Sequence, residues 1–323
     1  MNAAVCTIFE GHYHYGVAAL SNSLYENGFT GNIYAGYRGT LPEWILKGKK
    51  EAVCKWNNAI TLAPAKGIKI IFLPIETNYN MANYKPDFML ELWNGPAKNA
   101  ESIFYFDPDI VINDSWDSYE QWVNCGVALC EDVNSPLQKY HPRRQGWKSY
   151  YKEYNIDLNF KNAIYVNAGF VGLLKKDIPF LKLWIQMQEI MGPAIGGLEN
   201  SIFLNQSYNS TVLRMKGFQI FDKPDQDALN AAIEAYDGIV SYIGKEGMGF
   251  TEGESTMSHG MGSPKPWKAN HLLRAIQGKI PRNSDVIYWK NCSYPFLAHS
   301  KLEIKKKSIG IKLAKVIGRF YKV

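Results

Sequence analysis

An apolar run interrupted by two carboxylates is the feature of this sequence that most constrains the fold. Residues 103–112 read Ile-Phe-Tyr-Phe-Asp-Pro-Asp-Ile-Val-Ile, with β-branched and aromatic residues on both sides of the acidic pair. This pattern predicts a buried strand, a tight acidic bend and a second buried segment. Two like charges so close to a core are costly unless a cation lies between them. Asp107 and Asp109 are therefore candidate ligands of a divalent metal ion at a strand end.

The proline between the two carboxylates favours the binding of one cation by both of them. Pro108 fixes its own φ and pushes Asp107 toward an extended conformation, which holds both acidic side chains toward one point. Oxygen ligands at such a turn suit a hard cation such as Mn²⁺ or Mg²⁺ that also binds phosphate. A solvated pair of aspartates at a surface turn is the alternative interpretation.

Strand-like and helix-like segments alternate along the chain. Strands are expected at 5–9, 32–37 and 68–73, and helices at 15–26 and near 87–93. This alternation predicts an α/β fold with a mainly parallel central sheet and with ligands at the carboxyl ends of its strands. We expect a single domain over residues 1–300, followed by a basic amphipathic tail at 301–323. The aromatic and basic segment 140–154 is expected to leave the sheet, either to stack on sugars or as a plain surface insertion.

Positive charge is concentrated at the C-terminus. Residues 301–323 carry eight Lys and Arg residues against Glu303 alone, which is +7, so the other 300 residues sum to −1 within the total of +6. Apolar residues recur there at helical spacing beside a basic face. They are Ile309, Leu313, Val316, Ile317 and Phe320.

This tail is typical of a helix that lies on an anionic membrane. The alternative is a terminal helix whose stripe packs on the domain. No run of 18 apolar residues occurs, and no charged-then-apolar leader precedes the first expected strand. We therefore expect a cytoplasmic protein, peripheral on the inner face of the membrane. Nucleic acid is not an expected partner, because the body of the chain has no basic surplus.

Three polar motifs follow the acidic bend. Asn167-Ala-Gly-Phe leads into a buried strand, and Asp225-Gln226-Asp-Ala-Leu-Asn is expected to open a helix whose first turn favours acids. His259-Gly-Met-Gly-Ser-Pro-Lys-Pro-Trp joins an imidazole, two glycines and Lys265 between two prolines. Alone, an Asp-Gln-Asp is usually a helix cap and such a histidine a loop residue. The combination of all three with the acidic bend points to a site.

In this order, Phe-Asp-Pro-Asp, Asn-Ala-Gly, Asp-Gln-Asp-Ala-Leu-Asn and His-x-x-Gly-x-x-Lys-Pro-Trp resemble the signature set of the family 8 retaining glycosyltransferases. That family includes glycogenin and bacterial lipooligosaccharide galactosyltransferases. The resemblance spans residues 5–268 and implies a GT-A fold, which is the fold of nucleotide-diphospho-sugar transferases. It implies an enzyme that moves a hexose from a nucleotide-diphosphate sugar, with UDP as the expected nucleotide, to a saccharide or lipid-linked glycan.

The resemblance also implies roles for individual residues. Three residues match the ligands of the Mn (or Mg) ion that bridges the donor phosphates: Asp107, Asp109 and His259. Two more match residues that contact the donor diphosphate: Gly262 and Lys265. The residues that match positions lining the donor sugar are Asn167, Asp225 and Gln226. The residues that match positions near the nucleotide are Glu10 and Tyr13. Gln226 would face the anomeric carbon from the side opposite the leaving group, and attack from the leaving-group side would retain the stereochemistry.

Two other classes of enzyme share parts of this pattern. The acidic bend also fits the Asp-x-Asp-x-Val start of haloacid-dehalogenase-like phosphatases, in which the first Asp is a nucleophile. That fold normally places this strand first and needs a later Gly-Asp-x-x-x-Asp element, which the sequence lacks. A sugar nucleotidyltransferase would carry a Gly-rich, Arg-bearing loop after the first strand, which residues 10–13 do not form. A non-catalytic, membrane-tethered module that binds sugar nucleotides is the remaining alternative, and a donor-hydrolysis assay distinguishes it from an enzyme.

Overall fold

The computed structural model describes residues 1–200, 214–215 and 218–320. The chain divides into two compact units, and the boundaries between them fall inside several elements, strand β1 (Ala3–Glu10) among them. Unit 1 comprises residues 1–6, 75–105 and 119–245, and unit 2 comprises residues 7–74, 106–118 and 246–323. The expected boundary at residue 300, between a catalytic domain and a basic tail, stays a prediction.

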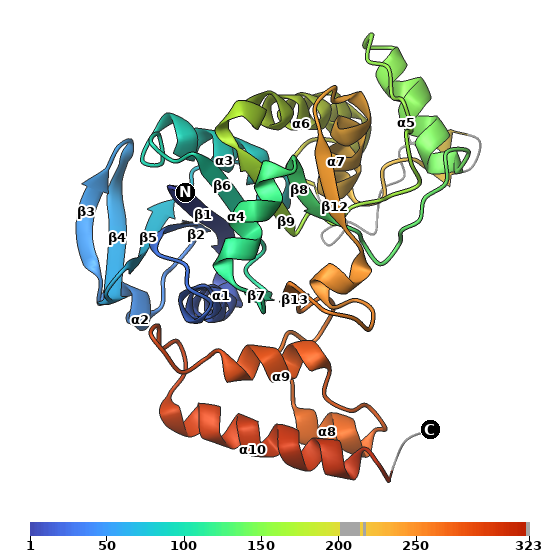
Figure 1. Cartoon of the computed structure of the whole chain (residues 1–323). Helices are drawn as coiled ribbons and strands as arrows, with labels where there is room; N and C mark the ends of the chain where they lie inside the picture. The colour runs from blue at the N-terminus through green and yellow to red at the C-terminus, as the bar shows by residue number, and fades with distance from the viewer. Residues whose placement is uncertain (201–213, 216–217, 321–323) are drawn as a thin grey trace. The chain divides into compact units, whose positions relative to one another are not determined.

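Unit 1 contains four strands of the central sheet and a set of helices. Helices α6 and α7 pack side by side (Figure 1). The strands are β6 (Ser102–Phe106), β8 (Val127–Cys130), β9 (Phe170–Leu174) and β12 (Val240–Ile243), and β10 (Arg214–Met215) pairs antiparallel with β11 (Phe218–Gln219). The helices are η2 (Met81–Tyr84), α3 (Lys85–Asn94), α4 (Trp116–Asn124), α5 (Pro142–Lys152), η3 (Lys175–Asp177), α6 (Ile178–Met191), η4 (Gly192–Ile195) and α7 (Pro224–Ala235).

Unit 2 contains the remaining strands and the C-terminal helices. Helix α10 lies alongside α8 and α9 (Figure 1). The strands are β2 (Gly31–Arg38), β3 (Lys49–Val53), β4 (Trp56–Ala65), β5 (Ile68–Pro74), β7 (Ile110–Ile112) and β13 (Met257–His259). The helices are η1 (Gly11–Tyr13), α1 (His14–Glu26), α2 (Glu43–Leu46), η6 (Lys245–Met248), α8 (His271–Ile276), α9 (Asn283–Lys290) and α10 (Lys301–Ile317).

Among the described residues, the central sheet has nine strands in the order β12-β8-β9-β6-β1-β2-β5-β4-β3. The pairs β1/β6, β2/β5 and β8/β12 are parallel, whereas β9 is antiparallel to β8, and β4 is antiparallel to both β5 and β3. This confirms the predicted α/β fold with a mainly parallel central sheet. The expected strands and helices at 5–9, 15–26, 32–37, 68–73 and 87–93 correspond to β1, α1, β2, β5 and α3.

The acidic bend has the predicted local structure. β6 and β7 are buried at every position, and the Asp-Pro-Asp turn joins them. The uncharged residues Ser-Ile-Phe-Tyr-Phe of β6 suit a fully buried strand. β7 leaves the central sheet and pairs antiparallel with β13, which places His259 opposite Ile110. The motif near residue 260 is therefore tied to the acidic bend by backbone pairing.

The segment 140–154 forms helix α5 and its flanks, and most of its aromatic surface is structural. Trp147 and Tyr151 are fully buried, and the indole of Trp147 donates to the carbonyl of Ile220 at 2.7 Å. Tyr140 and Tyr154 remain exposed. The most exposed aromatic residues of the segment are therefore those near its two ends.

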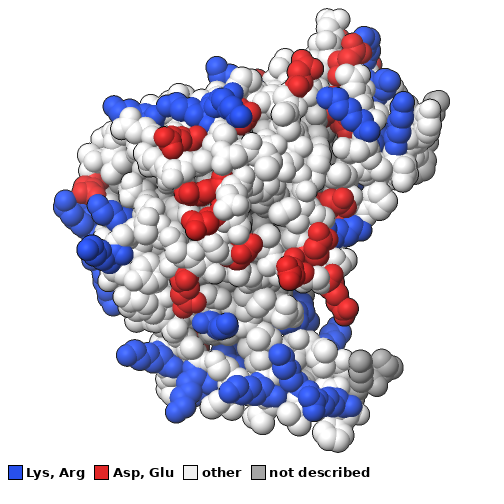
Figure 2. Space-filling view, viewed as in Figure 1, with Lys and Arg blue, Asp and Glu red and all other residues white. Residues whose placement is uncertain are grey.

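The tail is helical from Lys301, and one face packs on unit 2. Ile311 and Ala314 are buried, and Ile311 joins a cluster that includes Trp267 and Trp289. Figure 2 shows the Lys and Arg side chains gathered where α10 runs. The last three tail residues, 321–323, lie outside the described residues. In the part of the chain that the structure describes, no helix combines the length and apolar character needed to cross a lipid bilayer.

Candidate functional site

The acidic bend brings three candidate metal ligands together in unit 2. Asp107 and Asp109 lie in the turn between β6 and β7, where the amide of Ile110 donates to the carbonyl of Asp107 at 3.0 Å. His259 is the last residue of β13, the partner strand of β7. One carboxylate oxygen from each aspartate and one ring nitrogen of His259 all lie within 4.8 Å of one another.

The spacing of these atoms fits a divalent ion. Nε2 of His259 lies 3.3 Å from Oδ1 of Asp109 and 4.0 Å from Oδ2 of Asp107. Ligands at about 2.1 Å from a six-coordinate ion are about 3 Å apart when adjacent and about 4.2 Å apart when opposite. Two carboxylates and an imidazole suit Mn²⁺ better than Ca²⁺, because Ca²⁺ prefers ligands that are all oxygen. The residues present therefore fit the ion that the sequence resemblance implies.

Lys265 lies against the same carboxylates. Its Nζ donates to Oδ2 of Asp109 and, at 3.1 Å, to the carbonyl of Gly260. Burial alone would raise the pKa of Asp109, but the charges and hydrogen bonds of His259 and Lys265 hold it well below its ordinary value. Asp109 in turn raises the pKa of Lys265 against the opposing effect of burial. Asp109 is therefore ionised and ready to bind a cation over the whole physiological pH range.

The imidazole of His259 is oriented by packing. A metal-bound histidine usually donates its second ring N–H to an oxygen. Nδ1 of His259 is buried and has no hydrogen-bond partner among the residues described. The ring of Phe250 lies 5.9 Å from the imidazole, centroid to centroid, at an interplanar angle of 34°. Ring packing and the β13 backbone therefore set the direction of Nε2.

The turn that carries the two aspartates depends on a glycine in α1. A Cβ on Gly16 would lie 1.9 Å from the carbonyl oxygen of Pro108 and 3.1 Å from the ring of Trp267. Only a residue without a side chain lets α1 approach the acidic turn so closely. Nothing in the local sequence distinguishes Gly16 from another helix residue, so sequence analysis missed it.

The glycine-rich loop after β13 is held by Arg282, which sequence analysis also missed. Its guanidinium donates to the carbonyls of Met261 and Pro264 at 2.7 and 2.8 Å, and buried Asp285 accepts from it at 2.7 Å. Gly262 lies in this loop with φ +76°, a conformation that favours glycine. The only local signal was the Arg-x-x-Asp spacing, which reads as the start of helix α9. Arg282 therefore fixes the loop that carries Gly262 and Lys265.

The residues expected near the nucleotide lie at the end of β1. Tyr13 packs between Lys265, whose Nζ lies 5.6 Å from the ring centroid, and Trp267, whose ring centroid lies 5.5 Å away. The indole of Trp267 donates to Nδ1 of His12 at 2.8 Å. Glu10 accepts from Arg38 at 2.9 and 3.1 Å. The structure thus brings Tyr13 next to Lys265, and it pairs Glu10 with an arginine.

The residues expected at the donor sugar lie together in unit 1. Asn167 donates to Oδ2 of buried Asp132 at 2.7 Å and accepts from the amide of Gly169 at 2.8 Å. Oε1 of Gln226, in the first turn of α7, accepts from the amide of Ala168 at 3.4 Å. The segment before β9 and the first turn of α7 are therefore in direct contact.

Lys85 joins this group and was missed from the sequence. Its side chain is buried, and its Nζ donates to the carbonyl of Ala168 at 3.0 Å and to Oδ2 of Asp225 at 3.2 Å. A buried ammonium is costly unless it is paired in this way. Lys85 opens α3 and lies 140 residues before Asp225, so no local pattern could reveal the pair.

Asp227 and Asn230 of the same motif are scaffold residues. Asp227 accepts from the amides of Asp222 and Lys223 at 2.7 and 2.9 Å, and from the hydroxyl of Tyr165 at 2.7 Å. It also pairs with Arg143 of α5. Asn230 exchanges hydrogen bonds with the backbone of Val166 at 2.9 and 3.0 Å. These contacts fix the start of α7, where Asp225 and Gln226 lie.

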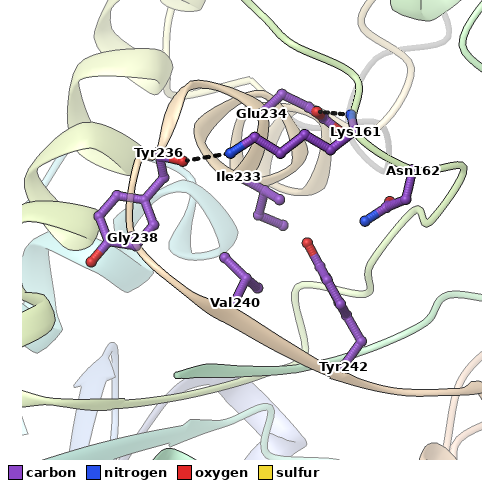
Figure 3. A pocket seen from close by; sticks show the side chains of 8 residues that line it. All are labelled: Lys161, Asn162, Ile233, Glu234, Tyr236, Gly238, Val240 and Tyr242. Atoms are coloured by element: carbon purple, nitrogen blue, oxygen red, sulfur yellow. Dashed lines mark hydrogen bonds between the residues drawn. The ribbon is translucent and has the colours of Figure 1, made fainter. Parts of the chain in front are cut away.

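A small cavity of about 150 Å³ opens elsewhere in unit 1 (Figure 3). The amide of Lys161 donates to buried Glu234 at its edge, and burial raises the pKa of Tyr242 to about 12. None of the residues that line it belongs to the predicted site. They are Lys161, Asn162, Ile233, Glu234, Tyr236, Gly238, Val240 and Tyr242.

No protein-family model matches this chain, and neither does any curated protein. Among solved structures, the apo structure of the bifunctional glycosyltransferase WbbM is 12% identical, with a TM-score of 0.50 over 95% of this chain and 52% of WbbM. GlyE, a glycosyltransferase of Streptococcus pneumoniae TIGR4, is 12% identical over 97% of this chain and 64% of GlyE, with a TM-score of 0.49.

The galactosyltransferase LgtC, in complex with donor and acceptor sugar analogues, is 15% identical over 94% of this chain and 99% of LgtC, with a TM-score of 0.49. The chain therefore spans about half of WbbM and less than two thirds of GlyE. The match to WbbM shows that the fold is that of a glycosyltransferase, which confirms the fold that the sequence resemblance implied.

Proposed function

We propose that this protein is a metal-dependent, retaining glycosyltransferase that moves a hexose from a UDP-sugar to a saccharide or a lipid-linked glycan. The observation that carries the proposal is the cluster of Asp107, Asp109 and His259 with Lys265 beside it, on a glycosyltransferase fold. The phosphatase alternative is disfavoured, because β6 is the sixth strand along the chain and not the first.

Lys265 and the metal ligands act on the leaving group in this proposal. When bound, Mn²⁺ would supply a Lewis acid for the two phosphates of the donor. Asp107, Asp109 and His259 would hold that ion. Lys265 then releases Asp109 and places its ammonium on the diphosphate, where negative charge develops as the bond to the sugar breaks. Tyr13 lies beside Lys265 and flanks the nucleotide end of the donor.

The unit 1 group acts on the sugar. As the bond between the anomeric carbon and the phosphate oxygen breaks, its electron pair leaves with the diphosphate and the ring gains positive charge. Asp225 and the amide oxygen of Gln226 stabilise that charge, and Asn167 binds the sugar hydroxyls. The acceptor hydroxyl bonds to the anomeric carbon from the leaving-group side, and its proton passes to the departing diphosphate. Lys85 keeps Asp225 in place.

The tail supplies the second part of the proposal. The exposed basic residues of α10 attract an anionic membrane, and its exposed apolar residues enter the head-group region. Attachment at the inner face would bring the enzyme to a lipid-linked acceptor. The support is the charge of +7 on residues 301–323 together with the exposure of Leu313 and Val316, each about half exposed.

A thermal-shift screen of nucleotide sugars tests the enzymatic part. Each sugar nucleotide is added with and without Mn²⁺, and the unfolding temperature is measured. A ligand that binds only the native state raises that temperature by mass action. We expect a UDP-sugar to stabilise the protein in the presence of Mn²⁺ and to have little effect with EDTA. Equal stabilisation by all nucleotides, or none by any, would contradict the proposal.

A further inference from the structure

Helices α8 and α10 of unit 2 both expose large apolar side chains. In α10 the exposed residues follow the stripe found in the sequence, with Leu313 and Val316 each about half exposed. The six-residue helix α8 and the segment after it expose a second set, which sequence analysis did not identify. These residues are Leu272 (38% exposed), Leu273 (53%), Ile276 (58%) and Ile280 (50%).

The two sets lie on helices that pack against each other. A Cβ on Gly318 would lie 2.2 Å from a methyl carbon of Ile280, so the end of α10 touches the segment after α8. Near its other end, Lys307 of α10 donates to the carbonyl of Ala269 at 2.8 Å. The buried side of the pair is supplied by other residues, Ala275 from α8 and Ile311 from α10. Folding of the pair therefore leaves both apolar sets partly exposed.

Basic residues surround both sets, and acidic ones are almost absent. The sequence has no Asp or Glu between Glu254 and Asp285, a stretch that contains α8 and five Lys and Arg residues. Glu303 is the single acidic residue of α10. The exposed side chains Lys268, Lys279 and Lys312 carry charge that no ion pair in the described part of the chain offsets. The charge on this surface is thus predominantly positive.

We propose that α8 and α10 together form one membrane-inserting surface, with an anionic lipid bilayer as its occupant. This inference rests on the membrane part of the proposed function and extends it from the tail to a second helix. Apolar side chains that border on lysines suit the head-group boundary, where the chains enter the acyl region and the ammonium groups reach the phosphates. A protein partner would need acidic residues matched one by one, whereas an anionic leaflet matches an unpatterned positive surface.

Vesicle sedimentation with the full chain tests this surface. Binding is measured to phosphatidylcholine vesicles with and without phosphatidylglycerol. One variant carries Leu273→Ser and Ile276→Ser, the other Leu313→Ser and Val316→Ser, and the matched control is Ile239→Ser, an exposed isoleucine of unit 1 (72% exposed). Each pair should weaken binding to anionic vesicles about tenfold, because each removes apolar area that enters the bilayer. The control should bind like the unchanged protein, and none should bind phosphatidylcholine alone.

The outcomes separate this inference from the proposed function. Unchanged binding of the α8 pair together with lost binding of the α10 pair would overturn the two-helix surface and leave attachment through the tail intact. Absence of binding by the unchanged protein would overturn both. Light scattering is run in parallel, and a dimer that the α8 pair dissociates would show that a second copy covers the surface, which also overturns the inference.

Sugar transfer to a soluble acceptor should be the same in all variants, since none touches the candidate site. Because the substituted residues are about half exposed, the fold should persist. If the variant with both α8 substitutions nevertheless shows no thermal unfolding transition, the single substitution Ile276→Asp is tested instead. It must weaken vesicle binding for the inference to stand.

Discussion

The two groups of candidate site residues differ in how their polar atoms are satisfied. In unit 2, Asp107, Asp109 and His259 face one another, and an ammonium from Lys265 balances the charge. In unit 1, Asn167 and Gln226 are hydrogen bonded to the backbone or to buried side chains, as are the scaffold residues around them. The first group has two carboxylates close together, and a bound cation would offset their negative charge. The second is held in a fixed geometry by hydrogen bonds and by the ion pairs of Lys85 with Asp225 and of Arg143 with Asp227.

This difference predicts different kinds of loss on mutation. Removing a charge from the unit 2 group should alter the binding of metal and diphosphate, since the charge is what the ligand meets. Removing an amide from the unit 1 group should mainly change turnover, since those groups meet charge that exists only as the sugar leaves.

Replacing Lys265 with Ala should have the largest effect. Turnover should fall by a factor on the order of 100, as for other lost electrostatic contacts to a leaving group. Donor affinity should fall as well. In the absence of donor, Mn²⁺ should bind more tightly than to the unchanged protein, because the ammonium that competes for Asp109 is gone. Steady-state kinetics and calorimetric titration measure the two effects, and Lys268→Ala, three residues away and exposed, is the control. Weaker metal binding in the Lys265 variant would contradict the competition.

Replacing Gly16 with Ala should destabilise the protein by about 2 kcal/mol, because the new methyl group overlaps the Pro108 carbonyl and the acidic turn must move. The affinity for the metal ion should fall as well, whereas the positions of Asn167 and Gln226 should not change. Denaturant unfolding and metal titration provide the measurements. Gly310→Ala, in α10 with open space around it, is the matched control and should be neutral or stabilising. Equal effects of the two substitutions would show that the α1 contact is unimportant.

Replacing Gln226 with Ala should lower turnover about tenfold and leave the Michaelis constant for the donor nearly unchanged. Metal affinity should not change, in contrast to the Lys265 variant. Kinetics at several donor concentrations separate the two parameters. Should turnover stay the same while donor binding weakens, Gln226 would be a ground-state contact and its assignment to the developing charge would be wrong.

The smallest effect concerns pH. Burial, together with His299 and His12, lowers the pKa of His14 from 6.5 to about 4. The unfolded chain therefore takes up a proton on this residue before the folded chain does, so its contribution is constant above pH 6.5 and is lost as the pH falls toward 4. His14→Gln should reduce the loss of unfolding free energy over this window by about 1 kcal/mol. Urea titrations at pH 7 and pH 4.5 would reveal it, and identical slopes against pH for both proteins would refute it.

Local patterns were sufficient for the parts of the site that lie within one motif. Three features could be predicted because hydrophobic runs and turn residues act over a few positions. They are the acidic bend between two buried strands, the start of α7 and the His-Gly-x-Gly loop. The residues that hold these motifs in place were not readable. Lys85 meets Asp225 across 140 residues, and Gly16 meets Pro108 across 92 positions of the sequence. Such contacts depend on the tertiary fold alone.

The tail shows the same limit. Helical periodicity correctly indicated a helix and an apolar stripe, but it could not tell which side the domain covers. The structure buries Ile311 and Ala314 and leaves Leu313 and Val316 of the stripe about half exposed. The exposed residues of α8 escaped notice because that helix is too short to show a period.

The central claim is that sugar transfer requires a metal ion held by Asp107, Asp109 and His259. It is tested most directly by measuring transfer from a UDP-sugar in EDTA and then during titration with Mn²⁺ or Ca²⁺, with Asp109→Asn as the ligand variant and Asp117→Asn as an exposed control. The account predicts no transfer in excess EDTA, recovery with Mn²⁺ and much less with Ca²⁺, and no recovery for Asp109→Asn at any Mn²⁺ concentration that restores the control. Full activity in excess EDTA would contradict it.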